Sequence, residues 1–295
     1  MIVYKTKAGT AFKIFNYFLM IVFCMMVIFP FINVIAISFS SSDAIIAGDV
    51  RFLPVQFTWD AYEFVFSNQA LIRAFFVTLC LTVICTVLTM LITLITGFAL
   101  ANKYTPCKKL FMTYFLVTMY FSGGLIPFYL TVNKLGLYNS YLALILPFVT
   151  KVFYIIIFRN SIMQTPQELI DAAEIDGAGM ARTLFDVIAP IIMPMIAAFT
   201  IFSAVENWNQ WYGVLLFIRD ESKWTLQYKV REILTNLDIL QDFISGNSAV
   251  GMGNNVHADN IKMASLLISV LPIIIIYPFL QKYFMHGIIV GAVKG

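Results

Sequence analysis

Long apolar stretches alternate with short charged segments along the whole chain. Uncharged runs lie between Lys13 and Asp43, Arg73 and Lys103, Lys109 and Lys134, Asp186 and Glu206, and Lys262 and Lys282. Each run is close to or above the roughly 20 residues that a helix needs to cross about 30 Å of hydrocarbon. A further run, from about 141 to 158, is interrupted only by Lys151. The pattern predicts six membrane-spanning helices, because backbone in lipid must satisfy its own hydrogen bonds and no alternating barrel pattern is present.

The predicted fold class is therefore an all-α integral membrane protein with a single transmembrane domain over residues 1–295. The first twelve or so residues, 1–12, form an N-terminal tail. A polar loop is expected at about 163–190 and an extracytoplasmic loop at about 219–259. The expected spans cover about 13–40, 71–101, 110–132, 140–160, 187–217 and 261–283.

Composition supports this class. The chain is 60% hydrophobic and only 12% charged, which leaves too few charged side chains to cover a soluble globule of 295 residues. The first span is too long for a removable signal peptide and lacks a small-residue cleavage site, so we expect it to remain as a membrane helix.

Lysines before the first span and between the second and third spans place both chain ends in the cytoplasm, by the rule that basic loops stay inside. A basic group in the predicted outer loop opposes this assignment. The cytoplasmic lysines are Lys5, Lys7, Lys13, Lys103, Lys108 and Lys109, and the opposing residues are Arg219, Lys223, Lys229 and Arg231.

Few residues suit catalysis or metal binding. The cysteines, Cys24, Cys80, Cys85 and Cys107, show no zinc-site or disulfide spacing, and small buried apolar roles suit them better. The chain has two histidines and no phosphate-binding glycine loop. We expect no metal and no cofactor in this chain, so any ATP and Mg²⁺ must be bound by another subunit.

The polar loop contains a helix with a clear start. Thr165 and Glu168 have the spacing of a capping box, with Pro166 at the first helical position. A narrow face then carries Leu169, Ala172, Ala173 and Asp176 at helical spacing. Gly177 and Gly179 allow a turn, and a second short helix with Met180, Leu184 and Val187 leads back to the membrane at Pro190.

This loop resembles the EAA loop of permease subunits of ATP-binding-cassette importers. The family pattern is Glu-Ala-Ala, three residues, Gly, nine residues and a hydrophobic pair before Pro. Here Asp171-Ala172-Ala173, Gly177 and Val187-Ile188-Ala189-Pro190 fit the spacing, with Asp171 in place of the Glu. The likeness extends over most of the chain through Phe121–Pro127, Leu144–Pro147, Trp208–Trp211 and Gly291–Gly295. These segments are similar to carbohydrate-import permeases related to the smaller maltose permease subunit, most of all the branch for complex oligosaccharides and polysaccharides.

The resemblance implies a mechanism of alternating access that is driven from outside the chain. In the family, this helix sits in a groove of a cytoplasmic ATPase dimer. The alternative is that the small residues only pack the helix within the permease. The residues that the resemblance assigns to ATPase coupling, with flanking charges added, are Glu168, Asp171, Ala172, Ala173, Asp176, Gly177 and Arg182.

A substrate path is predicted from three polar interruptions of the spans. Ser122, Gly123 and Gly124, followed by Pro127, favour a break in the third span that faces a cavity, although glycines also allow helices to pack closely. Lys151 is costly in lipid and should face the interior, where it contacts substrate or pairs with Glu206.

The end of the fifth span mixes amides with aromatic rings, as carbohydrate sites do, and an interfacial aromatic belt would look the same. This segment contains Glu206, Asn207, Trp208, Asn209, Gln210, Trp211 and Tyr212.

The outer loop is predicted to begin with an amphipathic helix over Val230–Leu240. A glycine-rich segment follows, and we expect Asp259 or Asn260 to cap the last span. By likeness to the maltose permease, that segment would dock the solute-binding protein, although a plain connector is the alternative. The docking residues are Gly246, Asn247, Gly251, Gly253, Asn254 and Asn255.

The resemblance implies a transmembrane subunit of an importer in the bacterial inner membrane. Expected partners are a second permease, an ATPase dimer, an extracytoplasmic solute-binding protein, an oligosaccharide substrate and membrane lipid, with no nucleic acid. Two other classes stay open. An ion-coupled secondary transporter should carry more carboxylates within its spans, and an intramembrane enzyme should carry a catalytic constellation that is not visible here.

Overall fold

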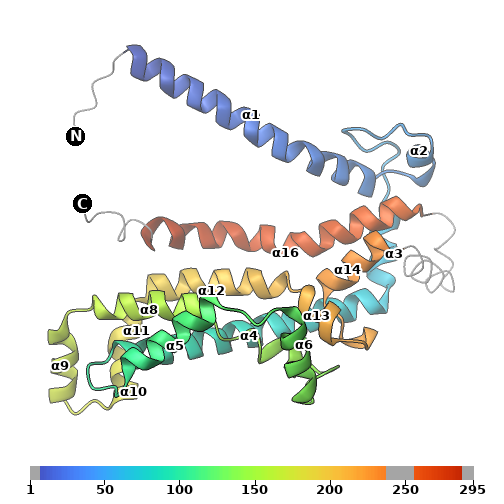
Figure 1. Cartoon of the computed structure of the whole chain (residues 1–295). Coiled ribbons are helices and arrows are strands. Elements are labelled where there is room, and N and C mark those ends of the chain that lie inside the picture. The colour runs from blue at the N-terminus through green and yellow to red at the C-terminus, as the bar shows by residue number, and fades with distance from the viewer. Residues whose placement is uncertain (1–6, 237–255, 288–295) are drawn as a thin grey trace. The chain divides into compact units, whose positions relative to one another are not determined.

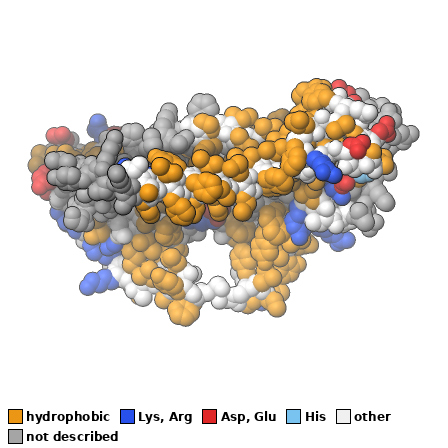
Figure 2. All heavy atoms as spheres, turned by 90° about the horizontal axis from the view of Figure 1, so that it is seen from above, with side chains coloured by type: hydrophobic (Ala, Val, Ile, Leu, Met, Phe, Trp, Pro, Cys, Tyr) orange, Lys and Arg blue, Asp and Glu red, His pale blue; other side chains and the backbone are white. Residues whose placement is uncertain are grey.

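The computed structural model describes residues 7–236 and 256–287, and these residues form helices and turns without any strand. The predicted all-α class is therefore confirmed over the part of the chain that is described (Figure 1). Figure 2 shows that hydrophobic side chains cover most of the described surface on the face in view.

The chain divides into two compact units that each combine distant parts of the sequence. The first contains Met1–Gln69 and Val230–Val270, and the second contains Ala70–Lys229 and Leu271–Gly295. Each unit is described by itself below.

The first unit is built on α1 and the beginning of α16. Asn260 of α16 donates from Nδ2 to the carbonyls of Ile37 and Ser40, at 2.9 and 2.7 Å, and so ties the helix to the end of α1. Asn260 is thus not the cap of this helix. The amide of Asp259 donates to Nδ1 of His257, so the residue before the helix caps it. The unit holds α1 (Lys7–Ser38), α2 (Ser42–Ile46), α3 (Asp60–Ser67), the end of α14 (Leu226–Thr235) and the first part of α16 (Ala258–Gly287).

The second unit contains the remaining helices. Its long helix is α4 (Gln69–Ala101), and the others are short because turns interrupt them. They are α5 (Lys108–Tyr120), α6 (Leu125–Lys134), α7 (Leu142–Ile145), α8 (Val152–Met163), α9 (Gln167–Ile175), α10 (Met180–Arg182), a π-helical turn (Thr183–Ile188), α11 (Ala189–Ile191), α12 (Met193–Trp208), α13 (Tyr212–Phe217) and a 3₁₀ turn (Glu221–Lys223).

Membrane-spanning potential is divided between straight and broken helices. Among the described residues, three helices are long and apolar enough to cross a membrane: Gly9–Ser38 within α1, α4 and Ala258–Pro278 within α16. Two bent pairs bring the number to five. The helices of these pairs meet at 117° around residues 121–124 and at 87° near residue 192. The expected fourth span is divided between α7 and α8, so the structure supports three to five spans and the sixth stays a prediction.

The break in the third span follows from Gly124. This residue has φ 85° and ψ 176°, a conformation open to glycine and strained for other residues. A Cβ at Gly124 would meet no atom within 4 Å, and at Gly123 it would meet only Pro127 at an ordinary 3.6 Å. The predicted break is confirmed, and these glycines do not serve close packing within the described chain.

The core of the second unit joins α4, α8 and the segment before α12. A cluster of buried residues here comprises Met90, Leu94, Phe158, Ile162, Leu184, Ile188, Ala189 and Ile192. At Gly97 the two helices approach so closely that a Cβ would lie 3.1 Å from the Phe158 Cβ and 3.2 Å from the Arg159 backbone nitrogen.

We expect Gly97→Leu to destabilise the protein by about 1–3 kcal/mol, because the added side chain would push against the α8 backbone. Ala99→Leu is the matched control, since Ala99 lies on the exposed side of the same helix. Thermal unfolding of the purified protein in nanodiscs measures the difference. Equal melting temperatures for the two variants would contradict the close contact.

Candidate functional site

The polar loop is built around α9, which starts one residue later than the sequence pattern predicted. Pro166 is the N-cap, and its carbonyl accepts from the amide of Leu169 at 3.2 Å. The predicted capping box is wrong, because the Thr165 amide already closes the end of α8 by donating to Ile162 at 3.0 Å. The Thr165 hydroxyl is buried and has no hydrogen-bond partner among the described residues.

The two alanines of the EAA-like segment point to different sides. Ala173 is buried, and Ile170 packs against the core cluster of α4 and α8. Ala172 is exposed together with Leu169 and Ile175, of which Ile175 is 86% exposed. The predicted narrow face is thus divided: its inner part anchors α9, and its outer part is a free apolar surface. Ile175 was missed, and its signal is an isoleucine between Glu174 and Asp176 in an otherwise polar stretch.

The end of α9 depends on Gly177. The amide of Gly177 donates to Glu174 and that of Ala178 donates to Ala173, which is the hydrogen-bond pattern of a Schellman motif. Gly177 has φ 75°, whereas Gly179 has φ −72° and precedes α10 in an extended conformation. Only the first of these glycines is required by backbone geometry.

The charges on the loop are partly engaged by the chain itself. The Asp171 carboxylate accepts from Gln167 Nε2 at 2.9 Å and lies 3.8 Å from Lys103 Nζ. The Tyr104 hydroxyl raises the pKa of Lys103, which therefore stays positively charged. Arg182 pairs with Asp186 at 3.4 Å.

By contrast, the other two carboxylates of the predicted coupling set remain exposed. Glu168 and Asp176 form no ion pair within the described residues. They are therefore open to a basic partner.

A cavity of about 120 Å³ lies between the loop and the turn that follows α4. Its wall combines the end of α4 and the next turn, the end of α8, and the inner side of α9 with Ile170 and Glu174. The helix that carries the coupling candidates thus packs against the same ends of α4 and α8 that contact each other.

A second candidate site lies where α8 begins and α12 ends. Lys151 is not inside a continuous helix as predicted, because the chain turns at 146–150 and Lys151 is the N-cap of α8. Its Nζ donates to Glu206 Oε1 of α12. This pairing is the structural alternative that the sequence left open.

The pair borders a cavity of about 180 Å³ that brings together most of the polar residues predicted near it. Lys151, Glu206, Asn207 and Trp211 line it. Five further residues line the cavity, of which Asn209, Gln210 and Tyr212 belong to the predicted polar and aromatic segment and only Phe148 and Gly213 were not predicted. The five are Phe148, Asn209, Gln210, Tyr212 and Gly213.

Other predicted path residues lie apart from this cavity. Trp208 is buried, and its ring packs edge to face on Phe75 at 5.7 Å, because the chain leaves the helix at Asn209 and turns the two tryptophans to different sides. Trp208 instead lines a larger, mostly apolar cavity of about 570 Å³ beside residues 272–277. Ser122, Gly123 and Gly124 are exposed and do not line the cavity at Lys151.

Polar side chains inside the second unit hold the cavity walls. Asn207 Nδ2 donates to Thr86 Oγ1 of α4 at 3.3 Å and to Ser203 Oγ at 3.2 Å. Gln210 Nε2 reaches the Leu144 carbonyl at 3.4 Å, and the Gln210 carbonyl accepts from Thr225 at 2.8 Å.

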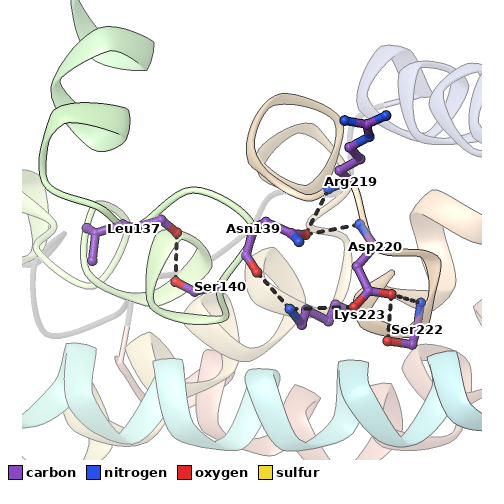
Figure 3. Close-up of polar contacts among 7 residues, drawn as sticks. All are labelled: Leu137, Asn139, Ser140, Arg219, Asp220, Ser222 and Lys223. Atoms are coloured by element: carbon purple, nitrogen blue, oxygen red, sulfur yellow. Dashed lines mark hydrogen bonds and ion pairs between the residues drawn. The ribbon is translucent and has the colours of Figure 1, made fainter.

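One asparagine joins the turn after α6 to the segment after α13 (Figure 3). Asn139 has φ 57°, and its Oδ1 accepts from the amides of Arg219 and Asp220 at 3.1 and 3.0 Å. The backbone amide of Asn139 donates to the Phe217 carbonyl, and the backbone carbonyl of Asn139 accepts from Lys223 Nζ at 2.8 Å. We call this arrangement the Asn139 clasp.

Asp220 extends the clasp. Hydrogen bonds from the hydroxyl and amide of Ser222 lower the pKa of Asp220, and the nearby Lys223 ammonium acts in the same direction. The carboxylate therefore stays charged and remains available to Lys223, which lies 3.5 Å away. The clasp joins the turn at Asn139 to the segment after α13, next to the apolar cluster of Val132, Ala143 and Phe217.

The outer loop is only partly described. The first part of the predicted amphipathic helix lies in α14, in which Val230 and Ile233 are buried, and its residues Leu237 and Leu240 lie outside the described residues. The proposed docking residues Gly246, Asn247, Gly251, Gly253, Asn254 and Asn255 lie outside the described residues.

Comparisons with known proteins agree with this architecture. The model of the family described as "Binding-protein-dependent transport system inner membrane component" matches residues 93–290. Protein LplC of Bacillus subtilis is 36% identical over 99% of this chain and 98% of its own length. The polygalacturonan/rhamnogalacturonan transport system permease protein YtcP of the same organism is 33% identical over 96% of this chain and 98% of its own.

A crystal structure of a bacterial ABC transporter involved in the import of the acidic polysaccharide alginate contains a similar chain. It has a TM-score of 0.89 and 27% identity, and the match covers 96% of this chain and 100% of that one. The similarity thus covers both the fold and nearly the whole length. This chain belongs to the family of binding-protein-dependent transport system inner membrane components, and it is a multi-pass transport permease rather than an enzyme.

Proposed function

We propose that the protein is the transmembrane subunit of an ATP-binding-cassette importer for oligosaccharides or complex glycan fragments. The observation that carries the substrate class is the cavity at Lys151 and Glu206. Its lining combines the rings of Phe148, Trp211 and Tyr212 with amide and charged groups, and sugars present CH faces to rings and hydroxyls to polar groups. The pectin-related and alginate substrates named for similar proteins support the same class.

The driving force comes from partner subunits. ATP and Mg²⁺ are bound by a cytoplasmic ATPase dimer that contacts the outer side of α9, at Leu169, Ala172 and Ile175. An exposed apolar surface of this kind is costly without a partner, which supports the assignment. Glu168 and Asp176 add ion pairs at its edge, each worth roughly 0.2–1 kcal/mol.

Motion then passes inward through the opposite side of α9. Ile170 connects the helix to the cluster of α4, α8 and the π-helical turn, and Ala173 of α9 is buried as well, so displacement of α9 moves the helices that carry the substrate cavity. The complete importer also contains a second permease and an extracytoplasmic solute-binding protein. The segment 246–255 contacts the binding protein in this proposal.

The proposed topology has six spans, with α7 and α8 together forming the fourth and both chain ends in the cytoplasm. Basic residues of the turn after α4 support this orientation. An ion-coupled secondary transporter is not favoured, because the family is defined by dependence on a binding protein.

The first test compares two glycines of the coupling loop. We expect Gly177→Val to lower receptor-stimulated ATP hydrolysis in proteoliposomes, where the receptor is the solute-binding protein. A side chain at φ 75° costs about 1–2 kcal/mol and distorts the end of α9. Such a cost corresponds to roughly a 5- to 30-fold decrease in the population of the native turn at the end of α9. Gly179→Val is the matched control, since that position is extended and open. Full stimulation in both variants would remove this loop from the coupling mechanism.

The second test separates a structural pair from a substrate contact. Lys151→Met should abolish uptake and weaken assembly, because it leaves Glu206 without its partner. The exchange variant Lys151→Glu with Glu206→Lys restores an ion pair at the same place. We expect it to recover assembly, measured by co-purification of the permease pair, while uptake of labelled oligosaccharide stays low. Recovery of uptake as well would mean that the pair is only structural.

The third test addresses orientation. Cys107 is exposed in the turn before α5, whereas Cys24 and Cys80 lie within apolar helices. A membrane-impermeant maleimide should therefore label Cys107 in inside-out vesicles and not in right-side-out vesicles. Cys107→Ser provides the background signal, and labelling from the opposite side would reverse the proposed topology.

A further inference from the structure

The loop between α2 and α3 folds back along α1 instead of standing free in water (Figure 1). Residues 47–59 form this loop, which lies entirely within the first unit. Two contacts join the first half of the loop, at residues 51 and 52, to α1. Asn33 Nδ2 donates to the Arg51 carbonyl at 2.7 Å, and the Phe52 ring packs edge to face on Phe29 with centroids 5.3 Å apart.

The sequence of α1 indicates the depth of these contacts in a membrane. From Lys13 to Asn33 the helix rises by about 30 Å over about 20 residues, which equals the thickness of the hydrocarbon core. Between these positions the run Tyr17–Ile32 contains no strongly polar side chain apart from the tyrosine hydroxyl. The apolar stretch of α1 ends between Asn33 and Ser38, so Asn33 lies at or inside the membrane boundary at the C-terminal end of α1, and Phe29 lies about one helical turn deeper.

Part of the loop backbone is hydrogen-bonded to α1 and to the residues that follow it. A carbonyl near the hydrocarbon must be satisfied internally, and Asn33 satisfies that of Arg51. Val55 accepts from the Ser41 amide and donates to the Ser40 hydroxyl, at 3.2 and 3.0 Å.

The second half of the loop, at residues 57–59, is held by aromatic contacts. The Thr58 amide donates to the Phe39 carbonyl at 3.0 Å, and the Phe57 ring stacks on Phe39 at 5.3 Å. Phe39 also contacts Trp59 and Tyr62. These rings hold residues 57–59 against the end of α1, while residues 51–53 at the tip of the loop project from it.

The projecting side chains are apolar, with one cation among them. Leu53 is 77% exposed and Phe52 is 51% exposed, and Trp59 is more than half exposed near the top. The Arg51 guanidinium forms no ion pair within the described residues. Large exposed apolar groups beside one arginine are poorly suited to water and well suited to the boundary between acyl chains and phosphates.

We propose that residues 51–53 insert into the lipid leaflet at the C-terminal end of α1. Phe52 and Leu53 enter the acyl-chain region, Arg51 reaches the lipid phosphates, and Trp59 lies at the interface. The loop is then a lipid-binding element that fixes α1 at one depth. The partner follows from the depth of Asn33, because a soluble receptor does not reach below that boundary.

A photocrosslinking experiment tests the proposal in the assembled importer. Para-benzoylphenylalanine is placed at Leu53, and the complex is irradiated in phospholipid nanodiscs and examined by mass spectrometry. The matched control carries the same residue at Asp43, which is exposed in the first turn of α2. We expect phospholipid adducts at Leu53 and only water-quenched probe at Asp43. Receptor-stimulated ATP hydrolysis shows that both variants are assembled.

A main adduct between Leu53 and protein, whether the second permease, the receptor or another part of this chain, overturns the proposal. So does equal quenching by water at both positions. A second readout covers a Leu53 variant that fails to assemble. The fluorescence of Trp59 is then measured with phospholipids brominated at different depths, in a chain that keeps Leu53 and in which the other three tryptophans are replaced by phenylalanine. Trp59 should be quenched more by bromine near the headgroup than by bromine near the chain end, and the reverse order or no quenching overturns the proposal.

Discussion

Backbone polar groups in a membrane have no water to bind, and this constraint shapes every interruption in the fold. The chain breaks its helices around residues 121–124, 146–150 and 209–211. Where these breaks lie near the cavity, side chains serve as backbone partners. Gln210 bonds to the Leu144 carbonyl, and Thr225 bonds to the Gln210 carbonyl. The polar residues that satisfy the broken backbone are thus in part those that line the cavity, so structural and functional demands fall on the same short segments.

The coupling loop shows how one helix can serve two surfaces. Its inner side is fixed by Ile170 and Ala173 on the core, while its outer side presents Leu169, Ala172 and Ile175. A helix that transmits motion must be fixed to the helices it moves and must also expose a surface to the partner that moves it. The Schellman turn at Gly177 separates α9 from the following helices, so the accessible side ends at a defined point.

Hydropathy was sufficient to predict an all-helical membrane protein and to isolate the polar loop, because transfer of long apolar runs dominates the energy. It could not predict which residues of a helix face inward. Neighbouring residues on a helix are separated by about 100°, and so Ala172 and Ala173 diverge once tertiary packing selects one face. The capping register was also wrong, since the end of α8 had already used the Thr165 amide.

The tryptophans show the same limit. Trp208 and Trp211 stand together in the sequence and apart in the structure, because the helix ends between them. Sequence pattern did identify Lys151 and Glu206 as possible partners through their cost in lipid.

The pairing of Lys151 with Glu206 has a consequence for biogenesis. The two residues are 55 positions apart, and at about 5–20 residues per second the ribosome needs roughly 3–11 seconds between them. During that interval Glu206 is not yet available to Lys151. The ion pair between α8 and α12 therefore forms only after both helices have been synthesised, so the wall of the cavity at Lys151 is completed late in synthesis.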